Sequence, residues 1–353
     1  MKPVRRLWVH AALLAVASLG ALYVWTRDTE TTNTAGDVRV WGGKPADVQK
    51  IAVETKTRQA TIESRTDGAG RWFEGTATSI GRPGPGELDE HGHPPHDHDH
   101  HDHDHHGHEG PGGDDAANDT PRTFQVVSVK PAERIAEALA PLFAVREVGA
   151  IEGDPAEDFG LGAPLGTLTF TIGGVERKLA IGGEAPGGSD RYVRNLETSI
   201  IYAVRGDFVR DLLAGEAALN ERDLHGFDEE DVQHVVITAG EKSRQVHRKG
   251  GAGGQATWSD PTTPDQPDEI ATAWIGKLDR LRPTEYLAEE PTNAVLVVRI
   301  EYFGRKGSVG FLELQRIPDQ EAGFLVRTEY TRRFARTAPS AAEQVEQELK
   351  TLL

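Results

Sequence analysis

An internal repeat is the sequence feature that most constrains how this chain can fold. Residues 47–53 read DVQKIAV, and residues 231–237, 184 positions later, read DVQHVVI. In each copy a second strand pattern follows, and then a tryptophan in a hairpin-like setting, Trp72 in the first copy and Trp258 in the second. The two tryptophans are 186 positions apart, so the spacing is nearly unchanged. Each copy is therefore predicted to begin with strands joined by tight turns.

An amphipathic helix is predicted next in each copy. Apolar residues recur at helical spacing over residues 131–148 and again over residues 267–287. Each stretch begins with a proline, which the first turn of a helix tolerates. The offset between the two helices is 136 instead of 186, because the first copy carries 50 extra residues between its tryptophan and its helix.

Further strands are predicted after each helix. Valine, isoleucine, threonine and aromatic residues alternate there with polar ones, as in strands with one buried face. The expected strands are 166–172, 176–181, 191–194 and 200–204 in the first copy, and 294–302, 307–315, 324–328 and 332–335 in the second. Helices over 206–213 and 340–353 close the copies. The pattern predicts an α+β fold of two repeated units, residues 39–227 and 228–353, each an antiparallel sheet packed on helices.

The extra residues of the first copy, 77–122, form an insertion that is rich in histidine, aspartate, glycine and proline. Neutral imidazole suits zinc, nickel and copper(II), and aspartates add oxygen ligands and lower the cost of collecting divalent cations. The predicted metal ligands are His91, His93, His96, His98, His100, His101, His103, His105, His106, His108, Asp97, Asp99, Asp102 and Asp104.

This histidine-rich run is expected to be disordered, because glycines and prolines flank it. A defined metal site needs a few ligands in fixed geometry with partners behind them, so we expect several interchangeable sites of moderate affinity. Such binding favours buffering or sensing of a metal over catalysis, and no cofactor is expected to be required. The alternative is a surface loop that tolerates drift in composition.

The amino terminus predicts a single membrane anchor within residues 1–27. Positive charges within residues 2–6 precede an uncharged run, Leu7–Trp25, which is long enough to span a bilayer and orients the amino terminus toward the cytoplasm. Residues 15–17, AVA, resemble a signal-peptide cleavage site, but the apolar run continues past them, so we expect an uncleaved anchor. Residues 28–38 form a polar tether, and the rest is expected on the periplasmic side of a bacterial inner membrane.

Charge and cysteine content exclude several classes of partner and chemistry. The chain has 39 basic and 56 acidic residues, a net charge of −17, which argues against nucleic acids and anionic membrane surfaces as main partners. Divalent cations or a basic protein fit better. The chain has no cysteine, which excludes disulfides, thiolate metal sites and a cysteine nucleophile.

A seven-residue motif, DFGLGAP at 158–164, precedes the strand patterns LGTLTFTIGG and VERKLAIGG and then DRYVRNLETSIIYAV at 190–204. Together these segments resemble the bacterial domain of unknown function 4340 family, over residues 39–353. The resemblance implies an amino-terminal anchor, a repeated α+β unit and an envelope role beside ABC transporters of the gliding-motility type. It implies no catalytic residue, and the histidine-rich run lies outside the family's usual pattern.

Motifs of common enzyme classes are missing from the sequence. It contains no G-x-S-x-G and no H-E-x-x-H, and its glycine clusters at 182–183, 187–188 and 250–254 do not match a phosphate-binding loop. Hairpin turns are expected at these clusters, and the carboxylate pairs 229–230 and 289–290 are expected in solvated loops.

The sequence thus favours a non-enzymatic, membrane-anchored envelope protein with an interaction or scaffold domain. A periplasmic metal-buffering or metal-delivery protein, acting through the histidine-rich run, is the alternative. An envelope hydrolase whose active site is assembled from distant residues is the third hypothesis, and it would require a cleft with strongly shifted ionisable groups.

Overall fold

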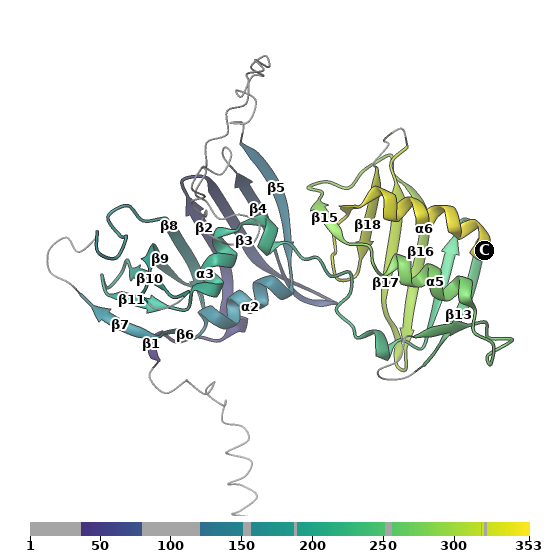
Figure 1. Cartoon of the computed structure of the whole chain (residues 1–353), viewed down its shortest axis with the longest axis horizontal. Coiled ribbons are helices and arrows are strands. Elements are labelled where there is room, and N and C mark those ends of the chain that lie inside the picture. Colours follow the sequence, from purple (N-terminus) through teal and green to yellow (C-terminus); the bar gives the residue numbers. More distant parts are fainter. Residues whose placement is uncertain are drawn as a thin grey trace, which may run out of the picture. The chain divides into compact units, whose positions relative to one another are not determined.

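Antiparallel strand pairing dominates the computed structural model, a mixed α+β fold with a few helices (Figure 1). The structure describes residues 37–79, 121–150, 157–186, 189–250, 256–318, 320 and 323–353. The predicted anchor, most of the tether and most of the histidine-rich insertion lie outside these residues. Across the ranges described, no helix is long and apolar enough to cross a membrane.

The first half pairs its strands in the order β4-β3-β2-β8-β9-β10-β11-β7. The bounds are β2 (Val48–Thr55), β3 (Arg58–Asp67), β4 (Gly70–Ser79), β7 (Arg146–Gly149), β8 (Gly166–Ile172), β9 (Val175–Glu184), β10 (Arg191–Asn195) and β11 (Ile201–Val204). Strand β5 (Arg122–Ser128) pairs with the outer edge of β4. Strands β1 (Val38–Trp41) and β6 (Leu142–Ala144) form a separate two-stranded sheet.

The second half pairs its strands in the order β14-β13-β12-β16-β17-β18-β19-β15. The bounds are β12 (His234–Ala239), β13 (Lys242–Lys249), β14 (Thr257–Ser259), β15 (Pro283–Tyr286), β16 (Val295–Gly304), β17 (Gly307–Arg316), β18 (Phe324–Thr328) and β19 (Ala335–Thr337). This order matches the first half strand for strand. The internal repeat of the sequence therefore corresponds to a repeat of connectivity. Two strands in each half were not predicted: the strand that contains the tryptophan, β4 or β14, and the strand β7 or β15 that precedes the four strands predicted after the long helix.

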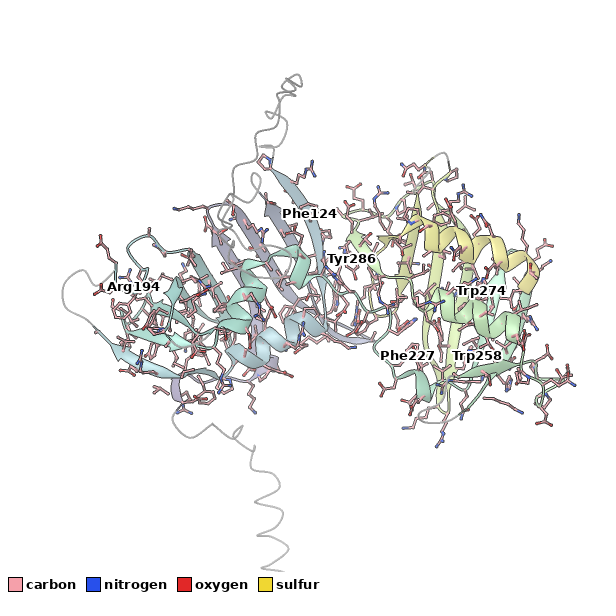
Figure 2. The ribbon with its side chains drawn as sticks, in the orientation of Figure 1. Phe124, Arg194, Phe227, Trp258, Trp274 and Tyr286 are labelled. Carbon is pink, nitrogen blue, oxygen red and sulfur yellow. The ribbon has the colours of Figure 1, made fainter. Side chains whose placement is uncertain are left out.

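Helices cover one face of each sheet. Their bounds are α2 (Lys130–Leu139), α3 (Gly206–Leu213), α4 (Glu216–Leu219), α5 (Glu269–Leu278) and α6 (Pro339–Leu352), with single 3₁₀ turns η1 (Pro45–Asp47) and η3 (Glu229–Asp231). Figure 1 shows α5 and α6 side by side over β16 to β18. Trp274, labelled in Figure 2, is fully buried on α5, and its Nε1 donates to the carbonyl oxygen of Val345 on α6 at 2.8 Å. The two helices are thus fixed to each other as well as to the sheet.

Two predicted helices are shorter than expected. The helix expected over 131–148 ends at Leu139, and residues 142–144 and 146–149 are strands β6 and β7. The helix expected over 267–287 ends at Leu278 and is followed by β15. In both copies an internal proline, Pro141 or Pro283, follows the observed end. Proline has no amide hydrogen and clashes with the preceding helical turn, so the apolar spacing beyond it belongs to strands.

The motif at 158–164 is a close packing of two backbone segments. Gly160 has a φ of 65°, and a Cβ there would lie 2.6 Å from the backbone nitrogen of Gly183. The Gly183 N–H donates to the carbonyl oxygen of Phe159 at 2.8 Å. The hairpin turn predicted at Gly182–Gly183 is therefore wrong, because both residues lie inside β9, where missing side chains let the motif approach. Residues 187–188 and 251–254 lie outside the described residues.

The insertion joins two strands that are already paired. Ser79 at the end of β4 and Arg122 at the start of β5 are partners in register. Deletion of residues 82–120 would leave residues 80, 81 and 121 between them, a length typical of hairpin loops. We expect the deletion variant to keep its melting temperature or to gain a few degrees, because each halving of a flexible loop recovers about 0.6 kcal/mol of closure entropy.

Thermal denaturation followed by circular dichroism measures this outcome. A full-length chain with the ten histidines of residues 91–108 replaced by serine serves as the control that separates length from composition. A melting temperature lowered by more than about 5 °C in the deletion variant alone would show that the insertion contributes to the folded core.

Candidate functional site

The predicted metal ligands, residues 91–108, lie outside the described residues, so their geometry is not part of the structure. Among the residues that the structure does describe, no three histidine, aspartate or glutamate side chains are grouped closely enough to hold a metal ion. The carboxylate pairs 229–230 and 289–290 are exposed, as expected, but the first pair lies in the 3₁₀ turn η3 and not in a loop. The side chains with the most unusual environment come from other parts of the chain.

A polar cluster lies at one end of the second sheet, which we call the His225 cluster: His225, Asp279, Tyr302 and Glu329. The Tyr302 hydroxyl on β16 donates to Oδ1 of Asp279 at 3.0 Å. His225 Nδ1 lies 3.2 Å from Oε1 of Glu329, just beyond β18, and its ring packs edge-on against Tyr302 with centroids 4.7 Å apart. Phe227, labelled in Figure 2, covers the imidazole at 4.5 Å between centroids. Four chain segments therefore meet at this cluster.

A glycine makes room for the cluster. Gly310 on β17 is the partner of Tyr302 in register, and a Cβ there would lie 2.4 Å from the carboxylate carbon of Glu329. The second oxygen of that carboxylate accepts the N–H of Phe311 at 2.7 Å. Glu329 is thus held by a backbone amide on one side and lies beside His225 on the other. An alanine at position 310 would displace it.

Burial shifts the protonation of two members of the cluster. It raises the pKa of Asp279 to about 6, against smaller lowering effects from His225 and from the Tyr302 hydrogen bond. Asp279 also caps the carboxyl end of α5, where the helix dipole disfavours negative charge. Burial, followed by the charge of Asp279, holds the pKa of Tyr302 well above its usual range. The cluster can therefore gain or lose a proton near pH 6.

One nitrogen of His225 has no partner among the described residues. Its Nε2 is buried without a hydrogen bond, although most buried polar atoms are satisfied. A buried carboxylate with a raised pKa and an unsatisfied imidazole both cost folding free energy, so the His225 cluster is a candidate functional site on physical grounds. No sequence motif could have identified it, because its members are separated by 23 or more residues.

A hollow of about 590 Å³ lies elsewhere, beside α2 and α4. Its wall includes Lys130 and Asp223, which form an ion pair at 2.7 Å. Glu221, also in the wall, is almost fully buried, and its carboxylate accepts the N–H of Lys130 at 2.9 Å and that of Asp223 at 3.0 Å. Glu221 thereby satisfies an amide at the start of α2, which is a structural role. Neither Asp279 nor Tyr302 lines this hollow.

The face of the second sheet opposite α5 and α6 carries a row of paired charges over aromatic rings, which we call the arginine row. Glu313 on β17, with 10% of its side chain exposed, accepts hydrogen bonds from Arg299 on β16 and, at 2.8 Å, from Arg327 on β18. Arg299 lies 4.5 Å above the ring of Phe311, and Arg327 lies 4.4 Å above that of Phe334. Arg299 and Arg327 are partly exposed, and each has a second acidic partner, Glu301 and Glu290 respectively. The row therefore combines paired charges with aromatic rings.

Replacement of Asp279 by asparagine is expected to stabilise the protein above pH 6. The folded protein holds the Asp279 proton up to about pH 6, whereas the unfolded chain releases it near pH 4. The free energy of unfolding therefore falls as pH rises from about 4 to about 6, and it stays lower above that. The full cost is about 3 kcal/mol at most. Thermal melts of Asp279→Asn should therefore show a gain of a few degrees at pH 7.5 that shrinks toward pH 4.

Glu230→Gln is the matched control, because this carboxylate is exposed in the 3₁₀ turn η3 and its loss should leave the pH dependence unchanged. An Asp279→Asn variant that is less stable than the parent at pH 7.5 would contradict the expectation. It would mean that the ionised carboxylate is stabilised by His225 more than burial destabilises it.

Comparison with known sequences and structures gives one match. A family model described as domain of unknown function (DUF4340) matches residues 129–295, from the residue before α2 to the first residue of β16. No curated protein and no solved structure matches the chain. The matched region contains the motif at 158–164, together with His225 and Asp279, whereas Tyr302 and Glu329 lie beyond it. The resemblance, expected over residues 39–353, is confirmed for residues 129–295, where the chain contains a DUF4340 domain.

Proposed function

We propose that this protein is a non-enzymatic component of the bacterial inner membrane whose repeated α+β region binds another envelope protein. Residues 7–25 serve as a single-pass anchor, and the distribution of positive charge before them supports a cytoplasmic amino terminus. The folded region then lies on the periplasmic side. The DUF4340 domain is consistent with this role, since the family resemblance implies an accessory of ABC-type transport or gliding-motility systems.

The arginine row is the observation that carries the proposal. Arginine and aromatic side chains are enriched at the centres of protein interfaces, where they contribute most of the binding energy. Glu313 already holds Arg299 and Arg327 in place, so a partner that binds here would freeze few additional side-chain torsions. Glu290 and Glu301 also pair with these arginines, so the surface presents both signs of charge beside aromatic rings. A preorganised surface of this kind suits recognition of a protein with both charged and apolar side chains.

Catalysis has less support than binding. An active site requires ionisable groups of shifted pKa in a space that admits a substrate. Tyr302 packs against Phe227, and Asp279 is buried beside it. In the hollow beside α2 the residues of shifted pKa, Lys130 and Glu133, are held in ion pairs with Asp223 and Arg71. Both residues of the hollow therefore already have an ionic partner.

A photo-crosslinking amino acid at position 315 tests the binding surface. Gln315 lies on the same face of β17 as Glu313, and Gln344 on the outer side of α6 provides a matched control of the same residue type. In intact cells, position 315 is expected to give a discrete crosslinked product in the alkali-resistant membrane fraction, and position 344 none. The triple variant Arg299→Ala, Glu313→Ala, Arg327→Ala should lose the product, and it leaves no unpaired buried carboxylate behind. Equal products from both positions would contradict the proposed surface.

Metal buffering or delivery by the histidine-rich run is the second candidate function, and the composition of the run is the observation that favours it. Isothermal titration of zinc, nickel and copper(II) into the full chain at pH 7.4, beside the chain without residues 91–108, tests it. Selective sub-micromolar binding that is lost with the deletion would establish metal handling. Weak, unselective binding would leave the run without a metal-handling role.

A further inference from the structure

Two histidines outside the run are brought together by strand pairing. His234 on β12 and His247 on β13 are direct partners in register. Their neighbours in sequence, Val235 and Val246, are buried in the core beneath α5 and α6. Because side chains alternate along a strand, both imidazoles lie on the opposite face, where solvent reaches them. The pair is therefore accessible and is fixed by the register of the sheet.

The distance between the two rings matches that of a shared metal ligand pair. The ring centroids are 5.3 Å apart, with planes inclined by 23°. Two imidazoles bound to one tetrahedral zinc, each with a Zn–N distance of about 2.1 Å, place their centroids roughly 5 Å apart. Offset stacking of two rings covers the same range of centroid distances, so the spacing fits both arrangements. In the metal-bound arrangement one nitrogen of each imidazole holds the ion in the plane of its ring.

Neighbouring side chains hold each ring in orientation. His234 stacks on Phe303 of β16 with centroids 4.7 Å apart and planes inclined by 2°. His247 Nε2 lies 2.8 Å from the side-chain amide nitrogen of Gln245, which donates to it. A half-turn of this amide puts its oxygen there instead; Nε2–H then donates to the oxygen and Nδ1 keeps a free lone pair, which is the usual arrangement behind a metal-binding imidazole.

Charge also favours a cation at this pair. Lys249, on the same face two residues beyond His247, is ion-paired with Asp265 at 2.9 Å. The net charge of −17 adds a general attraction for cations.

We propose that His234 and His247 form a binding site for one divalent transition-metal ion on the folded second sheet, separate from the histidine-rich run. The two imidazoles supply two ligands and water supplies the rest. Among divalent ions, a site of two nitrogens binds copper(II) most tightly, followed by nickel and zinc. The site differs from the run in kind, because its ligand geometry is set by strand register and is lost when the protein unfolds.

Copper(II) titration is the test, with the full chain in detergent and with the same chain lacking residues 91–108. The shortened chain is expected to bind one Cu²⁺, and Cu²⁺ is expected to raise its melting temperature, since only the folded state holds the pair. His234→Gln and His247→Gln should each weaken this binding about tenfold or more, because a single imidazole lacks the chelate advantage. In the full chain each variant should lose one bound Cu²⁺.

Ser243→Ala is the matched control, since Ser243 lies on the same face of β13 but pairs with Thr238 instead of His234. It should leave copper binding unchanged. Melting curves without metal establish that each glutamine variant folds. Copper binding that is equal in the parent and both folded glutamine variants would overturn the proposal, and so would the absence of any copper-induced gain in melting temperature.

Discussion

The alternation of side chains along the strands is the constraint on which the rest of the second half depends. One face of β12, β16, β17 and β18 supplies the apolar residues that α5 and α6 cover, and the hydrogen bond from Trp274 to the backbone of Val345 joins the two helices above them. Because that face of the sheet packs in the core, the residues that alternate with the apolar ones along these strands lie on the opposite face. The arginine row and the histidine pair are both products of this division, because their residues occupy the positions that the core does not use.

The His225 cluster arises where the apolar face ends. Tyr302 belongs to the core, but its hydroxyl reaches the end of the sheet and needs an acceptor, which Asp279 provides at the end of α5. Bringing that carboxyl into a poorly solvated position disfavours its ionised form, and His225 offsets this only in part. A backbone carbonyl or a water molecule could accept the hydrogen bond of the Tyr302 hydroxyl at a lower cost in folding free energy than a buried carboxyl. The cost points to a role that packing alone does not explain.

Much of the fold could be predicted from the sequence because its signals are local. Repeat spacing and alternation predicted six of the eight strands expected after the helices to within two residues at each end. The other two, expected at 176–181 and 332–335, end or begin three residues later. The helix ends were overestimated because apolar spacing continues past Pro141 and Pro283, where the same residues serve strands. The His225 cluster was beyond prediction for the opposite reason. Asp279, Tyr302 and Glu329 carry no local pattern. They meet only through the end of α5, the pairing of β16, β17 and β18, and the space left by Gly310.

The two groups of histidines illustrate two ways in which a chain can collect metal ligands. In residues 91–108 the ligands are close in sequence, so their capacity to bind follows from composition and needs no fold. His234 and His247 are 13 positions apart and meet only through the β12–β13 ladder. A shift of that register by one residue would turn one imidazole into the core and destroy the pair. Metal bound at the pair would therefore be coupled to the folded state, whereas metal bound by the run need not be. A chain that carries both can hold a reservoir and a structure-dependent site in one molecule.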